Sequence, residues 1–473
     1  MAPLKFLGKD KFCYLLLFLI VLSAIFLRFY QLGERFGFDW DQERDAFVAW
    51  DIIRNHHLVF LGPKVGPSDF FLGPFYNYLT LPFYFFFRMN PIGAAFGASL
   101  IGVLTVVVIF FVARSAFSVK VAIIASSFWT FSVFLVSSDR TAWNVNPFSL
   151  FLLIFLYLLL KFKDGKQFYL VILGGVFGLL IQLHFSAVFL LPIFLIFFLI
   201  FKPKLKFKYS TFAILTFLLV NLPFILFEIK NGFLNSKIII SFLLTSPPNP
   251  NSLSYLDNFT RAWKIFLEFS TNLIYPSSNF ALTAFLKSLV LVLLLTVFWI
   301  FLKYKDKTLL FLLLWVIFPV FGYILYRSDI FPPYYFMISA PAILLLFSYL
   351  AVKIFERNLF GKFLVTALLV FFFVANSIFF LTLKSDIGFS NKMRAVKFIV
   401  DRVGDRPLFV SYSTQLGYNK GYDYLLKYYG KESKDVPEVY HFSIVYPKER
   451  ESGSREWVFG GIKVIQRSEG LGD

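Results

Sequence analysis

Long apolar runs separated by short polar connections make up most of this sequence. Runs of roughly 20 apolar residues recur from the N-terminus to about residue 383, and a helix needs roughly that length to cross the hydrocarbon core of a bilayer. The pattern therefore predicts a polytopic α-helical membrane protein with about eleven transmembrane helices. The expected spans are residues 12–29, 92–112, 119–136, 148–160, 168–183, 185–201, 211–227, 281–302, 309–326, 335–352 and 363–383.

Composition and charge support this interpretation. Hydrophobic residues form 58% of the chain and charged residues 16%, whereas soluble proteins carry about 25% charged residues. The net charge is +18, and basic residues fall in every second connection between spans. Because basic loops tend to stay in the cytoplasm, we expect a multi-pass plasma-membrane protein with a cytoplasmic N-terminus and an extracytoplasmic C-terminal segment. We expect membrane lipids among its partners. The sequence contains no basic soluble module that would support nucleic-acid binding, so nucleic acid is not expected as a partner. The basic connections contain Lys5, Lys9, Lys11, Arg114, Lys120, Lys161, Lys163, Lys166, Lys202, Lys204, Lys206, Lys208, Lys303, Lys305, Lys307, Lys353, Arg357 and Lys362.

Two apolar segments need a separate interpretation. The first run, residues 12–27, has no small-x-small cleavage site and is interpreted as an uncleaved signal anchor. The segment 74–88 is aromatic but short, and counting it as a span would place every later lysine cluster outside the cell. It is therefore predicted to be a helix that lies at the outward-facing membrane interface. A re-entrant segment is the main alternative.

From about residue 384 the composition becomes that of a soluble protein. The mixture of helical and strand patterns there predicts a small α/β extracytoplasmic domain over residues 384–473. The membrane-embedded domain then covers residues 1–383, with 31–91 as its first external loop, which includes interfacial helices. The helical patterns of the C-terminal segment cover 393–403 and 422–429, and the strand patterns cover 407–412, 442–446 and 457–466.

An acidic stretch follows the first apolar run. Asp39, with Gln42 three residues later, has the spacing of a helix N-cap with a capping box. Asp41 and Arg44 then fall in the first turns and share one face of that helix. This pairing suits group transfer, in which the carboxylate accepts a proton and the guanidinium stabilises a departing phosphate. The alternative is an acidic helix start, favoured by the helix dipole, with an exposed salt bridge.

A second polar cluster, residues 137–147, lies on the predicted outer side. Its donors could bind a sugar or a phosphate, and an aromatic side chain in it could stack on a sugar ring. The alternative is a turn that starts the next helix. His184, at an outer helix end, is a further candidate, and its alternative role is that of a structural hydrogen-bonding residue. The candidate residues of the cluster are Asp139, Arg140, Trp143, Asn144 and Asn146.

Taken in order along the chain, these motifs resemble those of polytopic glycosyltransferases of the GT-C fold, of the protein O-mannosyltransferase and aminoarabinose (lipid A) transferase type. Residues 41–45 match the Asp and the Arg of an acidic motif in the first external loop of that family. Gln42 stands in place of its second acid and Asp45 in place of its aromatic residue. The other matches are a proline-led aromatic helix at 73–79, a Ser-Arg-x-x-Trp-Asn-Pro-Asn pattern at 138–147, and a tyrosine-to-proline pattern at Tyr335 and Pro341.

The resemblance implies a reaction and roles for these residues. Such enzymes take a sugar linked to a polyprenyl phosphate and transfer it, with inversion, to a lipid, glycan or protein acceptor on the outer face. Asp41 would be the general base, and Arg44 and Tyr335 would hold the donor phosphate. Where the family often has a basic residue before that tyrosine, this chain has Tyr334. The residues assigned to substrate binding are Asp39, Asp45, Tyr76, Asp139 (as a second acid near the acceptor), Arg140, Trp143, Asn144, Asn146 and His184.

No cofactor follows from the sequence. It contains no phosphate-binding glycine loop, and the single Cys13 allows neither an internal disulfide nor a cysteine metal cluster. Metal use varies within the family, so a divalent metal is left open. The competing hypothesis is a lipid or glycan transporter or flippase, but transporters place polar residues near the bilayer midplane, often in related halves. Here the charges fall in predicted outer loops and no repeat is visible. A non-catalytic scaffold is a third class.

Overall fold

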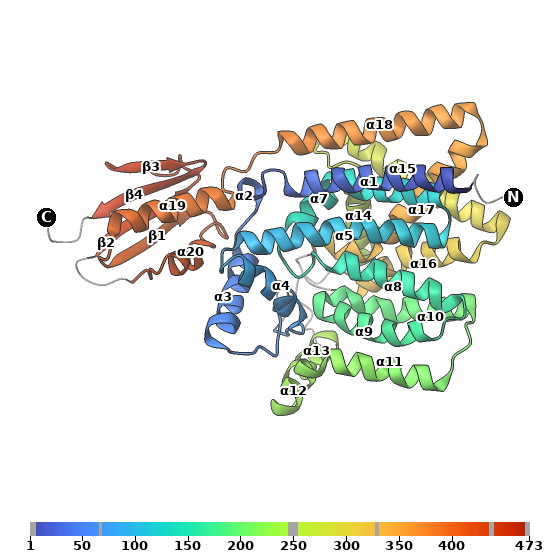
Figure 1. Ribbon diagram of the computed structural model, residues 1–473, viewed down its shortest axis with the longest axis horizontal. Coiled ribbons are helices and arrows are strands. Elements are labelled where there is room, and N and C mark those ends of the chain that lie inside the picture. Colours follow the sequence, from blue (N-terminus) through green and yellow to red (C-terminus); the bar gives the residue numbers. More distant parts are fainter. Residues whose placement is uncertain (1–5, 66–68, 245–253, 327–330, 435–438, 469–473) are drawn as a thin grey trace.

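Helices form most of the molecule, and a small sheet lies beyond one end of the helical bundle (Figure 1). The computed structural model describes residues 6–65, 69–244, 254–326, 331–434 and 439–468. Within these ranges, six helical segments are long and apolar enough to cross a membrane. They are α1 (Phe6–Phe29), α5 (Ile92–Ala116), α15 (Phe280–Tyr304), α16 (Lys307–Gly322) with η2 (Tyr323–Leu325), η3 (Pro333–Ser339) with α17 (Ala340–Arg357), and α18 (Leu359–Thr382).

Two further apolar runs form bent helix pairs. Helix α6 (Val119–Phe131) meets α7 (Val133–Arg140) at 65°, and α11 (Phe207–Val220) meets α12 (Leu222–Lys230) at 67°. At the first bend, the backbone N–H of Val133 donates to the side-chain oxygen of Asn376 on α18, at 3.1 Å. A side chain thus satisfies a backbone donor at the bend, as expected for a broken helix.

Three of the expected spans correspond to shorter helices. They are α8 (Phe148–Lys163), α9 (Phe168–Leu183), and η1 (Phe185–Phe189) followed by α10 (Leu190–Phe201). The 16 residues of α8 or α9 give a length of about 24 Å, less than the roughly 30 Å of the hydrocarbon core. Every expected span is therefore helical, and the polytopic helical fold class is confirmed. The number of helices that cross the membrane stays a prediction.

Helix α14 (Tyr255–Ile274) is a long helix that the hydropathy pattern did not indicate. It follows α13 (Leu234–Leu244) and packs against α15, α16, α7 and η3. Ala262, Phe266, Phe269 and Leu273 form a buried stripe along it, whereas its other faces carry charged residues. The mean hydropathy over consecutive residues does not reveal an amphipathic helix of this kind, because its apolar positions recur only every three or four residues.

The short aromatic segment of the first external loop forms α4 (Phe75–Phe86). Its 12 residues give a length of about 18 Å, which is too short for a membrane span. Helix α4 packs against α5, α9 and the polar helix α3 (Trp40–Asn55), at the end of the bundle that faces the sheet (Figure 1). A single turn, α2 (Leu32–Arg35), links α1 to this region. The length of α4 agrees with the prediction that it does not cross, and its interfacial position stays a prediction.

The C-terminal unit is a four-stranded sheet with two helices. Its sheet has the order β1-β2-β4-β3, in which β1 pairs with β2 in parallel and the other pairs are antiparallel. The small α/β unit is therefore confirmed, although the predicted strand 457–466 is a hairpin of two strands. Its elements are α19 (Phe389–Val403), β1 (Leu408–Thr414), α20 (Tyr422–Tyr428), β2 (Tyr440–Tyr446), β3 (Glu456–Phe459) and β4 (Ile462–Ser468).

One hydrophobic core joins this unit to the start of α3. Phe38, which is fully buried, contacts the rings of Phe36, Phe389 and Tyr424, with ring centroids 5.7 to 6.1 Å apart. Tyr424 also packs edge-on against Phe47 of α3, at 5.3 Å. The residues just before α3 are thus fixed between the membrane bundle and the C-terminal unit.

Candidate active site

A polar cavity of about 470 Å³ lies where several helices end, beside α3. Its wall combines the charged start of α3, the loop before α8, the break between α9 and η1, and the aromatic start of η3. The lining residues are Trp40, Asp41, Arg44, Pro63, Lys64, Val65, Leu72, Trp143, Asn144, Val145, His184, Phe185, Ser186, Tyr323, Tyr326, Tyr334 and Tyr335. Segments far apart in the sequence therefore meet around Asp41 and Arg44.

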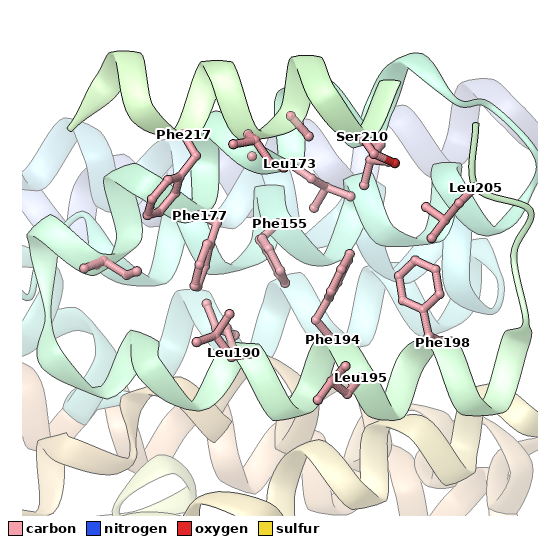
Figure 2. A pocket seen from close by; sticks show the side chains of 16 residues that line it. Phe155, Leu173, Phe177, Leu190, Phe194, Leu195, Phe198, Leu205, Ser210 and Phe217 are labelled. Carbon is pink, nitrogen blue, oxygen red and sulfur yellow. The ribbon is translucent and has the colours of Figure 1, made fainter. Parts of the chain in front are cut away.

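A larger hollow, of about 780 Å³, lies among α8, α9, α10 and α11 (Figure 2). Its wall is almost entirely aliphatic and aromatic, with Phe155, Phe177 and Phe194 directed into it and Ser210 as its only hydroxyl-bearing side chain. Because it contains no ionisable side chain, this hollow offers no acid, base or cation. The polar cavity beside α3 is therefore the better candidate for chemistry.

Asp41 and Arg44 form a contact on the cavity side of α3. The guanidinium Nη1 of Arg44 donates to Oδ1 of Asp41 at 2.7 Å, and its Nε donates to Oδ1 of Asp45 at 2.8 Å. The Asp41 side chain is 40% exposed and that of Arg44 is 31% exposed, whereas that of Asp45 is 3% exposed. Asp45 thus orients the guanidinium from inside the protein, while Asp41 remains open to a ligand.

Burial affects the ionisation of Asp45. It raises the pKa of Asp45 to about 7, even though the neighbouring Arg44 charge and its hydrogen bonds act in the opposite direction. The second carboxylate oxygen of Asp45 is buried and has no hydrogen-bond partner in the described part of the chain. Nη2 of Arg44 is also buried and lies 2.8 Å from the first carboxylate oxygen of Asp45 as part of their ion pair.

The predicted cap of α3 is present. Asp39 stands at the N-cap and forms a capping box with Gln42, whose Oε1 accepts a hydrogen bond from the Asp39 backbone N–H at 3.2 Å. The Asp39 carboxylate does not line the cavity. It pairs with Lys392 of α19 at 2.5 Å. Asp39 therefore fixes the start of α3, and the structure does not place it as a ligand of the cavity.

Aromatic and amide side chains complete the wall of the cavity. The Trp143 ring lies 4.8 Å from that of Tyr334, and His184 lies 5.4 Å from Tyr335. Asn144 donates to the backbone oxygen of Leu183 at 2.6 Å. The Trp143 indole N–H is buried and has no acceptor among the described residues. Trp143, Asn144, His184 and Tyr335, all candidates from the sequence, thus share one cavity with Asp41 and Arg44.

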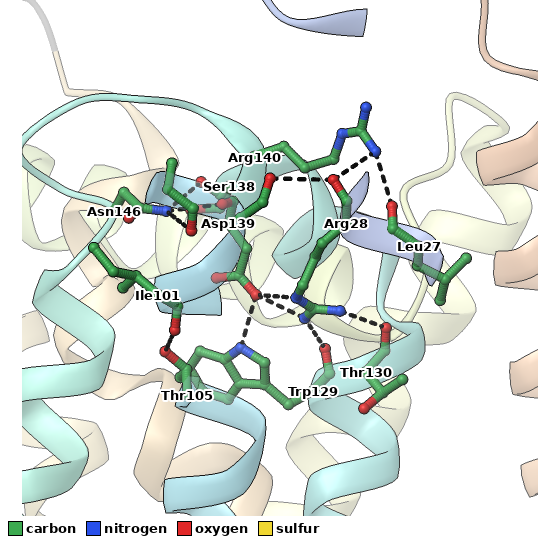
Figure 3. Close-up of polar contacts among 12 residues, drawn as sticks. Leu27, Arg28, Ile101, Thr105, Trp129, Thr130, Ser138, Asp139, Arg140 and Asn146 are labelled. Carbon is green, nitrogen blue, oxygen red and sulfur yellow. Dashed lines mark hydrogen bonds and ion pairs between the residues drawn. The ribbon is translucent and has the colours of Figure 1, made fainter. Parts of the chain in front are cut away.

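Other candidates from the same sequence cluster do not line the cavity and make the polar contacts drawn in Figure 3. Asp139 is buried and accepts hydrogen bonds from Nη2 of Arg28 at 2.6 Å, from Nε of Arg28 at 3.0 Å and from the Trp129 indole at 3.2 Å. Arg140 donates to the backbone oxygens of residues 27, 28 and 31. Asn146 donates to the Asp139 backbone oxygen at 2.9 Å. These three side chains tie α7 to α1 and to the loop before α8, and none of them lines the cavity.

Tyr76 also lies outside the cavity lining. It is 3% exposed and belongs to the main core of the bundle. Helix α4, which carries it, packs against both α3 and α5. Tyr76 lies close enough to Asp45, Arg44 and Asp41 to interact with their charges, and its substrate-binding role stays a prediction.

Lys64 is a cavity residue that the sequence interpretation missed. Backbone hydrogen bonds from Gly62 to Leu72 and from Leu72 to Pro63, at 2.8 and 2.9 Å, close the loop that carries it. Its ammonium pairs with Asp69 at 2.7 Å, and the Lys64 side chain is 47% exposed. The only signal in the sequence was a lone lysine between two Gly-Pro turns. The loop supplies a second cation to the same cavity as Arg44.

The described residues show no metal-binding group. Within the ranges given above, no three His, Cys, Asp or Glu side chains come together in an arrangement that could hold a metal ion. The lining that the structure describes supplies the carboxylate of Asp41, the cations of Arg44 and Lys64, the imidazole of His184 and several aromatic rings.

Comparison with known proteins points to one fold. A family model described as Dolichyl-phosphate-mannose-protein mannosyltransferase matches residues 72–227. Comparison with curated proteins finds no match. The structure resembles ArnT from Cupriavidus metallidurans bound to undecaprenyl phosphate, with 13% identity, a TM-score of 0.58, and coverage of 95% of this chain and 97% of that one.

A second group of solved structures has the same overall arrangement. The archaeal oligosaccharyltransferase AglB from Archaeoglobus fulgidus, in complex with an inhibitory peptide and a dolichol-phosphate, matches with 13% identity and a TM-score of 0.54. That match covers 92% of this chain and 69% of the other. The predicted resemblance to GT-C glycosyltransferases and the predicted GT-C-like fold are thereby confirmed.

Proposed function

We propose that this chain is a membrane glycosyltransferase that moves a sugar, with inversion, from a polyprenyl-phosphate donor to an acceptor on the outer face of the membrane. The observation that carries the proposal is the Asp41–Arg44 pair, which opens into a cavity of about 470 Å³ with a second cation at Lys64. Two proteins of similar fold have been captured with undecaprenyl phosphate and with a dolichol-phosphate. A lipid-linked phosphate is therefore the ligand class that fits the two cations.

The reaction needs a base for the attacking acceptor group and positive charge for the departing phosphate. Asp41 takes a proton from the hydroxyl or amine of the acceptor, which attacks the anomeric carbon as the bond to the phosphate oxygen breaks. The electron pair of that bond leaves with the polyprenyl phosphate, whose added charge is stabilised by Arg44 and Lys64. The proton stays on Asp41 until the glycosylated product departs.

The aromatic wall has a role in holding the sugar. Trp143 offers a ring face and an indole N–H that has no acceptor among the residues described, and both suit a pyranose ring with its hydroxyl groups. Tyr335 lies across the cavity, where its hydroxyl can contact the donor. The position of this site at one end of the bundle differs from the midplane position expected for a transporter.

The two cations lead to a prediction about donor binding. Replacement of Arg44 by alanine should weaken binding of a polyprenyl-phosphate sugar about 10- to 100-fold, because a charged hydrogen bond contributes about 1.5–3 kcal/mol. Arg44→Lys should lose less, since it keeps the charge but not the planar fork, and Lys64→Met should weaken binding by a smaller factor. The measurement is the equilibrium binding of a fluorescent polyprenyl-phosphate analogue to the purified protein in detergent.

A matched control is available on the same helix. Arg54 lies exposed in the last turn of α3, outside the cavity lining, so Arg54→Ala should leave donor binding unchanged. Equal affinity in the wild type, Arg44→Ala and Lys64→Met would remove both cations from the donor site.

The proposal places the cavity and the C-terminal unit outside the cell, with the N-terminus in the cytoplasm. The basis is the alternation of lysine-rich connections under the positive-inside rule. Reporter proteins fused after Lys166 and Lys208 should report the cytoplasm, and one fused after Asp473 should report the outer side. A cytoplasmic signal from the C-terminal fusion would contradict this orientation.

A further inference from the structure

The first turns of α3 are held by the C-terminal unit from the side away from the cavity. Asp39 and Glu43 are four residues apart, so they lie on one face of the helix start, and both contact the C-terminal unit. Asp41 and Arg44 lie on the cavity side. Contacts from the C-terminal unit thus hold the residues on either side of Asp41, the residue proposed as the base.

Lys392 makes the first contact. Its side chain on α19 is fully buried, and its ammonium donates to the Asp39 carboxylate at 2.5 Å, to the Phe38 backbone oxygen at 2.9 Å and to the Lys420 backbone oxygen at 2.7 Å. All three N–H groups of the ammonium are therefore used. It also lies 5.0 Å from the centre of the Tyr422 ring. A buried ammonium with all its hydrogen bonds satisfied allows little movement of its partners, since any shift leaves a charge unsolvated.

Glu43 makes the second contact. It is 5% exposed, and its carboxylate accepts hydrogen bonds from the backbone N–H groups of Gly421 and Tyr424, the latter at 3.1 Å. Gly421 has a φ of +92°, and a Cβ atom there would lie 2.0 Å from the Phe38 backbone oxygen. Only glycine permits this approach. The loop before α20 is thus shaped to reach the start of α3.

We propose that Lys392 is a positioning residue for the glycosyl transfer, and that the C-terminal unit acts through it and through Glu43 to fix the orientation of the Asp41 carboxylate. This inference rests on the proposed function. Asp41 is two residues from Asp39, so freeing the helix start would displace its carboxylate from the acceptor. A displacement of about 1 Å in a reacting group can lower the rate about 10²-fold. The donor phosphate is held mainly by Arg44, which Asp45 orients independently from inside the bundle.

The test compares Lys392→Met with Lys397→Met in the full-length protein. Lys397 is exposed on the same helix and serves as the matched control. Lys392→Met should lower kcat for transfer about 10- to 100-fold and change the donor Kd by no more than about threefold. Lys397→Met should match the wild type in both. Normal kcat in Lys392→Met, or equal losses of kcat and donor binding, would overturn the positioning role.

Hydrogen exchange gives a readout that does not depend on activity. In the protein without ligands, Lys392→Met should speed exchange of the backbone N–H groups of residues 42–46 and leave those of residues 50–54 unchanged. Unchanged exchange at residues 42–46 would overturn the contact as a restraint on α3. If exchange rises as expected but the wild type transfers no sugar from any polyprenyl-phosphate donor, the proposed function falls, and the catalytic part of this inference falls with it.

A milder variant covers the case in which Lys392→Met does not fold. Glu43→Gln keeps the size of the side chain and one acceptor oxygen, and replaces charge-assisted hydrogen bonds by neutral ones of about half their strength. It should lower kcat about five- to tenfold with donor binding kept. An unchanged kcat together with faster exchange at residues 42–46 would again overturn the positioning role.

Discussion

Replacement of Asp41 by asparagine is expected to lower turnover about 10²–10⁴-fold, because the variant cannot accept the proton of the acceptor. Asparagine keeps the shape of the side chain, and its oxygen can still accept the hydrogen bond from Arg44. Donor affinity and the thermal midpoint of unfolding should therefore stay close to those of the wild type. The measurements are single-turnover transfer, donor binding and thermal unfolding of the same purified samples.

Asp39→Asn is the matched control for this prediction. It makes the same chemical change two residues earlier, at a position that caps α3 and pairs with Lys392 outside the cavity. Asparagine is also a good N-cap residue, and its oxygen can still accept a hydrogen bond from Lys392, but it leaves that buried ammonium without its counter-charge. Some stability and some turnover should therefore be lost, but much less turnover than in Asp41→Asn. Loss of turnover in Asp39→Asn with normal turnover in Asp41→Asn would mean that the base has been assigned to the wrong carboxylate.

Replacement of Asp139 by leucine is expected to destabilise the protein by about 3–5 kcal/mol, because it leaves the buried Arg28 guanidinium without its counter-charge. The Asp139 side chain also packs closely against α5, since a Cβ atom added to Gly102 would lie 2.5 Å from the Asp139 Cβ. The expected observation is a lower thermal midpoint in detergent. The fraction that remains folded should transfer sugar at a nearly normal rate. This result would distinguish the structural role of Asp139 from the catalytic role proposed for Asp41.

The double variant Arg28→Met with Asp139→Leu provides the control. It removes both charges together, so no unpaired charge remains and part of the lost stability should return. Additive losses in the double variant would show that the ion pair is not the source of the effect. A folded Asp139→Leu protein without transferase activity would instead favour the acceptor-side role that the sequence resemblance implied for Asp139.

The local features of the site could be predicted from the sequence because they depend on helix geometry alone. The spacing from Asp39 to Gln42 fixes a capping box, and the spacing from Asp41 to Arg44 places both side chains on one face. Both features are present in the structure. The cavity residues Trp143 and Asn144 were also expected, as polar or aromatic side chains next to a predicted outer helix end.

Features that depend on distant partners could not be predicted in this way. Asp139 looked like an exposed acid because it ends an apolar run, but its partner Arg28 is 111 residues earlier in the chain. Lys64 gave only the weak signal of a lysine between turns, because it reaches the cavity through a loop closure. Lys392 gave no local signal, because it reaches Asp39 only through packing of the C-terminal unit on α3. Hydropathy alone does not indicate which charged residues in such a chain find a buried partner.

The central claim is that this protein transfers a sugar from a polyprenyl phosphate with Asp41 as the base. The most direct test incubates the purified protein with a panel of polyprenyl-phosphate sugars labelled in the sugar, together with membrane lipid, glycan and peptide acceptors. We expect the label from one donor to appear on one acceptor with the opposite anomeric configuration, and Asp41→Asn to give almost no product. Transfer with retained configuration, or equal product from the wild type and Asp41→Asn, would contradict the account.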